Sequence, residues 1–297
     1  MLWDKMLQPY PRMAAGHTLE DWYSALLEQL TKPSPLELAM LGGRLAPTPG
    51  LAFLAGYQGA LRALWPSAPW TLGALCVTEN KSVRPADMQT RLSELHLSGQ
   101  KDFVTAGDAA QWLLVAAREE ADGLLPRVAV TVVSSGAPGV RVEQLPALGF
   151  MPDVSHARLS LDHACCERLP GDGWDDYVKP FRSIEDLHVL AAVGAWLYGV
   201  GQESGWPADL LLRLLALLSG CTEVSRGSAN APTTHVLLGG LFAQFEALAP
   251  ELDEELASGD AHWATLWQRD KALMTIARSA RVQRLQKALA QVVLPTR

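Results

Sequence analysis

The sequence predicts an α+β fold with N-terminal helices, a central antiparallel β domain and a C-terminal four-helix bundle. The hydrophobic period is helical up to about residue 70, then changes to short β-branched runs between turn residues, and is helical again from Asp176. A chain of 297 residues is long enough to bury a sizeable core. We therefore expect an N-terminal helical domain (1–70), a β domain (71–165) and a C-terminal helical bundle (166–297).

The N-terminal region shows the start and stop signals of three helices. Thr18 is followed by Glu20 and Asp21, which is the pattern of a capped helix with acidic residues in its first turn. Pro33 and Pro35 end this helix. Two further apolar helical stretches follow, at 36–45 and 52–64.

The central region reads as strands because its apolar runs are short and rich in β-branched residues. The sequence around residues 95–99 alternates and then turns, which predicts a hairpin. The other predicted strands lie at 112–117, 128–133, 140–142 and 156–161. We expect these strands to form one antiparallel sheet, closed or sandwich-like.

Four apolar helical stretches make up the C-terminal region, and short loops between them are typical of a bundle. We expect loops at 203–207, 226–232 and 249–260. The predicted helices are 184–200, 209–221, 233–248 and 262–291.

Composition excludes several classes of protein. A net charge of −7 without a basic run argues against a nucleic-acid partner. The four cysteines lack metal-ligand spacing, so we expect no metal site, and we interpret Cys165 and Cys166 as two small buried residues rather than a redox pair. The N-terminus lacks a signal-peptide pattern, and the longest apolar run is too short to cross a membrane. We expect a cytoplasmic protein.

Two segments carry the main functional signal. Leu75–Glu79 and Gly99–Thr105 both read as strands that end in a threonine. A strand-end threonine offers a hydroxyl and backbone N–H groups to a planar polar ligand, and an aromatic residue two positions earlier can cover a ring. The pair resembles the "CVTE" and "NGxKxWIT" segments of the acyl-CoA dehydrogenases, and Arg269-Asp270 with 282–285 resembles that family's closing "RD…QIQRL" segment.

The resemblance implies a cofactor site for FAD. It assigns the flavin ring to Cys76, Val77, Thr78, Phe103 and Thr105, and it leaves Ser82 as the hydroxyl nearest to the family's missing Gly-Ser-Asp turn. The alternative is that these are ordinary strand residues. No cation stands at 202–206, where the family holds the pyrophosphate, so FAD absent or weakly bound remains open.

The family's catalytic base is missing from its usual place. The equivalent stretch, 276–281, contains no acidic residue. A minority of the family carries the base on the first bundle helix, and this alignment selects Asp186, with Glu185 beside it, as the catalytic candidates. The alternative is an acidic first helical turn that follows Ser183 as N-cap.

The resemblance therefore implies a flavin-linked oxidoreductase that acts on the CH–CH bond of an acyl thioester such as an acyl-CoA. The alternative is a non-catalytic, flavin-poor binding or scaffold subunit derived from that family. The family also implies an oligomer, either a homodimer or a heteromer with a related subunit.

Overall fold

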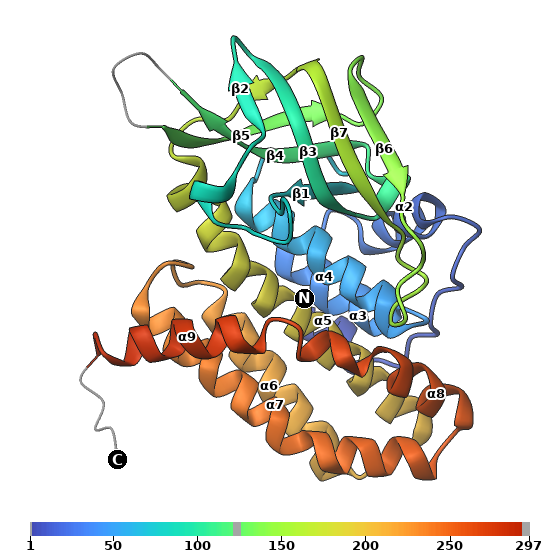
Figure 1. Cartoon of the computed structure of the whole chain (residues 1–297). Helices are drawn as coiled ribbons and strands as arrows, with labels where there is room; N and C mark the ends of the chain where they lie inside the picture. Colours follow the sequence, from blue (N-terminus) through green and yellow to red (C-terminus); the bar gives the residue numbers. More distant parts are fainter. Residues whose placement is uncertain (1, 121–125, 293–297) are drawn as a thin grey trace.

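A computed structural model describes residues 2–120 and 126–292 of the chain, so residue 1 and residues 293–297, the outer ends of the first and third predicted regions, lie outside the described residues. Helices precede and follow a single sheet, as the sequence predicts, and Figure 1 shows the sheet above a helical layer. The predicted fold class is confirmed. The exact division at residues 70 and 165 stays a prediction.

Local capping signals explain where the first helices begin. Thr18 accepts a hydrogen bond from the backbone of Asp21, and Ser34 and Glu37 form a reciprocal capping box. Pro49 extends the last of these helices beyond its predicted start because proline is well suited to a first helical turn. The helices before the sheet are α1 (Leu2–Leu7), α2 (Leu19–Leu30), α3 (Pro35–Leu45) and α4 (Pro49–Leu64).

The sheet is mixed rather than antiparallel throughout. Its strand order is β6-β7-β3-β2-β4-β5-β8, and β1 pairs with β4 outside this path. Strands β1 and β2 both run parallel to β4, because the chain leaves and re-enters the sheet between them. The strands are β1 (Gly73–Cys76), β2 (Arg91–Ser93), β3 (His96–Thr105), β4 (Trp112–Glu119), β5 (Arg127–Ser134), β6 (Val140–Gln144), β7 (His156–Cys165) and β8 (Glu167–Arg168).

Two predictions for this region were wrong, the position of the hairpin turn and the burial of both Cys165 and Cys166. The hairpin turn lies before residues 96–99, at Glu94 and Leu95, which both adopt positive φ. Gly99 instead marks an irregularity in the pairing of β3 with β7. Cys166 is buried but Cys165 is exposed, because successive residues of an extended chain point to opposite sides.

Two of the C-terminal helices are longer than predicted, and the last predicted helix is divided into shorter ones. Helix α5 (Lys179–Ser204) follows a π-helical turn, η3 (Gly173–Val178), so Ser183 lies buried inside α5 and is not its N-cap. Helix α7 (Pro232–Ser258) continues through Pro250 across the predicted loop at 249–260. The last predicted helix divides into α8 (Ala261–Asp270), the short η4 (Lys271–Met274) and α9 (Arg278–Leu289), and α6 (Ala208–Val224) completes the set.

Helix α5 is the central element of the helical layer. It lies beside α3 and α4, and the closest approach is made by Gly43, where an added Cβ would come 2.1 Å from the carbonyl oxygen of Ala192. One face of the sheet packs on α4 and α5 through Tyr57, Leu114 and Phe181. The other face curls around its own apolar core. The start of α5 therefore lies against the sheet.

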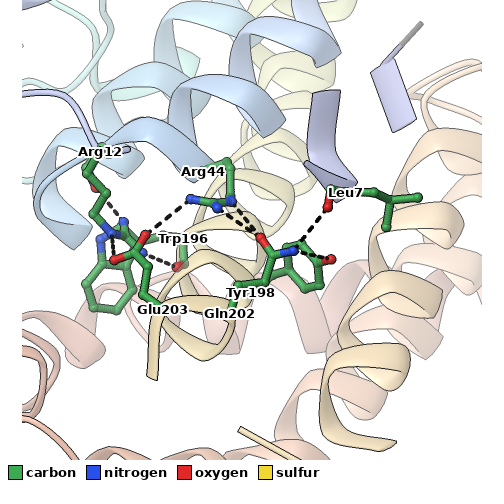
Figure 2. A network of polar contacts seen from close by, with 8 residues as sticks. Leu7, Arg12, Arg44, Trp196, Tyr198, Gln202 and Glu203 are labelled. Atoms are coloured by element: carbon green, nitrogen blue, oxygen red, sulfur yellow. Dashed lines mark hydrogen bonds and ion pairs between the residues drawn. The ribbon is translucent and has the colours of Figure 1, made fainter. Parts of the chain in front are cut away.

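A polar network fixes the C-terminal end of α5 (Figure 2). Arg44 of α3 is 2 % exposed and donates to Gln202 at 2.9 and 3.1 Å, and it pairs with Glu203 at 3.3 Å. Arg12 pairs with the other carboxylate oxygen of Glu203 at 2.9 Å and lies over the ring of Trp196. The network ties the N-terminal segment, α3 and α5 together.

Candidate functional site

A cavity of about 210 Å³ lies between the sheet and the first turns of α5. We call it the slot. Both threonine-ended segments line it, and they are joined directly because the backbone N–H of Asp102 donates to the carbonyl of Thr78 at 2.8 Å. Its lining residues are Tyr57, Leu75, Val77, Thr78, Val83, Phe103, Thr105, Val178, Phe181, Arg182 and Glu185.

The slot brings together four of the six residues predicted to bind the cofactor. Val77, Thr78, Phe103 and Thr105 line it, and Phe103 is 47 % exposed there, as a side chain that covers a ring should be before the ring binds.

Two predicted residues lie elsewhere. Cys76 is fully buried in the core on the opposite face of the sheet, because neighbouring strand residues alternate in direction, and burial raises the pKa of its thiol to about 12. The Ser82 hydroxyl donates to Asp87 at 2.6 Å and accepts from the backbone N–H of Arg84, and its neighbour Val83 lines the slot instead.

Glu185 stands on the boundary between the slot and a second cavity of about 180 Å³. Within the described part of the chain its carboxylate makes neither a hydrogen bond nor an ion pair. Burial, followed by the neighbouring charge of Asp186, raises its pKa to about 8, and Arg284 opposes this only in part. A carboxylate with such a pKa can take up a proton near neutral pH.

Asp186 is buried and engaged by two arginines of α9. Arg281 donates to it at 3.2 Å, and Arg284 pairs with its other carboxylate oxygen. Burial raises the pKa of Asp186, and the two guanidinium groups oppose that shift. Each carboxylate oxygen of Asp186 is thus paired with an arginine of α9. This arrangement is better suited to holding α9 against α5 than to accepting a proton from a substrate.

The second cavity is mostly apolar. Phe53 of α4, Val189 of α5 and Phe242 of α7 contribute walls, and η4 with the residues after it closes one side. Ile276 and Ala277 belong to the stretch where the family's usual base stands, and they present apolar side chains here. This cavity suits a hydrocarbon chain, and we call it the acyl cavity.

The slot has the chemistry of a site for a flat heterocycle. Val77, Phe103 and Phe181 supply apolar surfaces, while Thr78 and Thr105 supply hydroxyls. Arg182 adds a cation, and one of its terminal nitrogens (Nη2) is buried without a hydrogen-bond partner among the described residues. This nitrogen is available to donate to an acceptor of a ligand. The residues present therefore fit a flavin ring.

Sequence reasoning missed Tyr57 and Arg182. The Tyr57 hydroxyl accepts a hydrogen bond from the backbone N–H of Leu75 at 2.9 Å, so it fixes β1, which directly precedes Val77 and Thr78. Nothing in the local sequence of α4 marks this role. For Arg182 the signal was a cation in the first turns of α5, three residues before Glu185 and thus on the same helix face.

No helix in the described ranges is long and apolar enough to cross a membrane. The described residues also contain no group of three or more His, Cys, Asp or Glu side chains placed to hold a metal ion.

Comparisons with known proteins connect this geometry to one fold. No family model matches the chain. A 95-residue segment, 30% of the chain, is 36% identical to 3-sulfinopropanoyl-CoA desulfinase of Paraburkholderia xenovorans, and the match spans only 24% of that protein.

Solved structures match over nearly the whole chain. Butyryl-CoA dehydrogenase from Megasphaera elsdenii aligns with a TM-score of 0.63 at 14% identity, over 92% of this chain and 88% of that one. FkbI, described as acting in the biosynthesis of a methoxymalonyl extender unit, aligns with a TM-score of 0.59 at 21% identity, over 95% and 98%. A glutaryl-CoA dehydrogenase from Mycobacterium smegmatis in complex with FADH2 aligns at 0.57 with 14% identity, over 94% and 91%.

Proposed function

Because the chain has the fold of the acyl-CoA dehydrogenases, we propose that it is a flavin-linked oxidoreductase acting on the CH–CH bond of an acyl thioester. The slot takes the flavin ring, the acyl cavity takes the acyl chain, and Glu185 is the base. Support for a thioester substrate comes from the similar proteins, which include a CoA desulfinase, a butyryl-CoA dehydrogenase and a glutaryl-CoA dehydrogenase.

The observation that carries the proposal is the position of Glu185. It is shared by the slot and the acyl cavity, and it has no hydrogen bond or ion pair to the described residues. A base for this reaction must reach the substrate carbon while the ring lies on the other side of that carbon. The position of Glu185 between the two cavities supports this role for it, whereas Asp186 is held by Arg281 and Arg284. We therefore propose Glu185 as the base, the role for which the sequence favoured Asp186.

The chain's own residues account for the proton transfer. The Glu185 carboxylate removes the proton α to the thioester carbonyl, and its raised pKa of about 8 makes it a competent base near neutral pH. A flavin held in the slot would supply the acceptor for the hydride that leaves the β carbon. Thr78 and Thr105 would offer hydroxyls to the ring, and Phe103 would cover its face.

The test is a reductive titration. The purified protein is reconstituted with FAD, and an acyl-CoA such as butyryl-CoA is added without oxygen. We expect a yellow protein that is bleached by the thioester, and Glu185→Gln should remain yellow but lose bleaching by at least about a hundredfold. Glu223→Gln, which changes an exposed carboxylate on α6, is the control and should bleach normally. Unchanged bleaching in Glu185→Gln clears Glu185 of the role of base.

A second candidate function is a non-catalytic, flavin-poor binding or scaffold subunit. It is favoured by Gln202 and Glu203, which stand where the family holds the pyrophosphate and are committed to Arg44. A colourless protein that cannot be reconstituted with FAD would support this candidate against the first.

Self-association is part of either proposal. Related helical bundles pair between subunits, so we expect a homodimer or a heteromer with a related chain, and light scattering of the purified protein tests this. A cytoplasmic location also stays a prediction.

A further inference from the structure

A third cavity, of about 540 Å³, lies next to the slot and shares Arg182 with it. It is formed by three helix segments that are far apart in the sequence: the start of α5, the start of α7 and the C-terminal half of α9. Its lining residues are Trp174, Lys179, Arg182, Asn230, Pro232, His235, Arg284, Lys287, Ala288 and Gln291. We call it the cationic cavity.

Its charge is of one sign. Lys179, Arg182, Arg284 and Lys287 line it, and no carboxylate is found among its described lining residues. Among the residues that the structure describes, two of these cations pair with a carboxylate, Lys179 with Asp175 at 3.3 Å and Arg284 with Asp186. Arg182 and Lys287 have no acidic partner within the described residues, so they leave about two positive charges uncompensated there.

Arg182 is the best-positioned of the four cations. Its guanidinium lies 5.1 Å from the centre of the Trp174 ring, which fixes its plane. Its Nη2 is buried and, within the described chain, has no hydrogen-bond partner. An unpaired buried donor of a guanidinium is costly, and an anionic oxygen from a ligand removes that cost.

The start of α7 adds to this field. Helix α7 begins at Pro232 without a side-chain cap, so its first N–H groups and the positive end of its dipole are not satisfied by a capping side chain. His235 accompanies them, with Nδ1 3.3 Å from the Ser183 hydroxyl. Burial, followed by the charges of Arg284 and Lys179, lowers the pKa of His235, which agrees with a positive potential in the cavity.

We propose that the cationic cavity binds the pyrophosphate of a nucleotide whose other end occupies the slot or the acyl cavity. This inference rests on the proposed function and deepens it, since FAD and coenzyme A both carry a pyrophosphate. Arg182 connects the cationic cavity to the slot, while His235 and Arg284 connect it to a groove between α7 and α9 that shares Phe242 and Arg281 with the acyl cavity. Either route places a phosphate-bearing arm among the same cations.

The experiment is calorimetric titration of the flavin-free, full-length protein with inorganic pyrophosphate at low salt. We expect saturable binding that weakens about tenfold in Arg182→Gln and in Lys287→Gln, since each removes one charge-assisted hydrogen bond or ion contact. Lys287 is exposed and lines the cationic cavity but neither the slot nor the acyl cavity, so its replacement is compatible with folding and spares the slot. The control is Arg141→Gln, which removes a cation 76% exposed on β6 and should bind pyrophosphate as the parent does.

Competition identifies the source of the pyrophosphate. Displacement by FAD but not by coenzyme A assigns the cavity to the flavin, and the reverse result assigns it to the thioester carrier. Absence of binding, equal weakening in Arg141→Gln, or displacement by neither nucleotide overturns the inference. These outcomes are separate from the bleaching test: Lys287-dependent pyrophosphate binding with no bleaching rejects the proposed chemistry alone, and bleaching without pyrophosphate binding rejects the cationic cavity alone.

Discussion

Glu79 and Lys101 form a buried ion pair that joins the two segments lining the slot. The Lys101 ammonium lies 2.5 Å from a Glu79 carboxylate oxygen, and its side chain is fully buried. Glu79 also accepts the backbone N–H groups of Gln89 and Thr90, which fixes the connection into β2. Burial would raise the pKa of Glu79, but Lys101 and these hydrogen bonds bring it below its ordinary value. The motifs that suggested the family are thus joined by their own charged residues.

Lys101→Met should destabilise the protein strongly, because it leaves the Glu79 carboxylate buried without its cation. We expect a loss of about 3–5 kcal/mol in the free energy of unfolding, measured by urea denaturation. The additional change Glu79→Gln should recover part of the loss. Arg91→Met, which breaks an exposed pair with Glu120, is the control and should cost only about 0–1 kcal/mol. Equal losses for Lys101→Met and Arg91→Met would show that burial of the Glu79 pair is unimportant.

Stability should depend on pH through Glu185. Its pKa rises from an ordinary value near 4.5 to about 8 on folding, so between these two values the folded state binds more protons than the unfolded state. Stability from this group therefore decreases as pH rises through that window and is constant above it. Glu185→Gln is neutral at every pH, so its melting temperature relative to wild type should increase between about pH 5 and pH 9. A difference that is constant with pH would mean that Glu185 is ordinarily solvated.

The helices before the sheet were predictable because their signals are local. Thr18 and Ser34 each accept a hydrogen bond from the backbone of a residue only three positions later, and proline residues mark the breaks between helices. The sheet was less predictable because strand partners are set by distant segments: the parallel pairing of β1 with β4 joins Gly73 to Trp112. The turn at Glu94 and Leu95 carries no glycine, so the hairpin was misplaced.

The candidate base illustrates the same limit. Sequence placed Asp186 and Glu185 together, but neighbours on a helix point about 100° apart, and only tertiary structure decides which one faces the cavities. The arginines that hold Asp186 lie 95 and 98 residues later in the chain. Val77, Thr78, Phe103 and Thr105 were selected because their two segments resemble motifs of the acyl-CoA dehydrogenases, and all four line the slot. The same resemblance selected Cys76, which lies in the core of the other face because neighbouring strand residues alternate in direction.

Asp186→Asn separates stability from chemistry at this pair. It leaves Arg281 and Arg284, which are mostly buried, without their shared carboxylate, so we expect a loss of about 3 kcal/mol in urea denaturation. The folded fraction should still be bleached by butyryl-CoA, whereas Glu185→Gln should not. Loss of bleaching in well-folded Asp186→Asn, with bleaching retained in Glu185→Gln, would return the role of base to Asp186.

The close packing of α3 on α5 predicts an opposite effect for two glycine-to-alanine changes. At Gly43 an added Cβ would lie 2.1 Å from the Ala192 carbonyl oxygen, and backbone cannot yield as a flexible side chain can. Gly43→Ala should therefore separate the helices and cost about 3 kcal/mol or more in urea denaturation. Gly240→Ala is the matched control, because it lies in the interior of α7 with no atom within 4 Å of the added Cβ. Alanine there should stabilise the protein by about 0.5–1 kcal/mol through helix propensity alone. If both changes stabilise the protein, α3 and α5 are not in backbone contact, and the start of α5, which carries Arg182 and Glu185, is not fixed by α3.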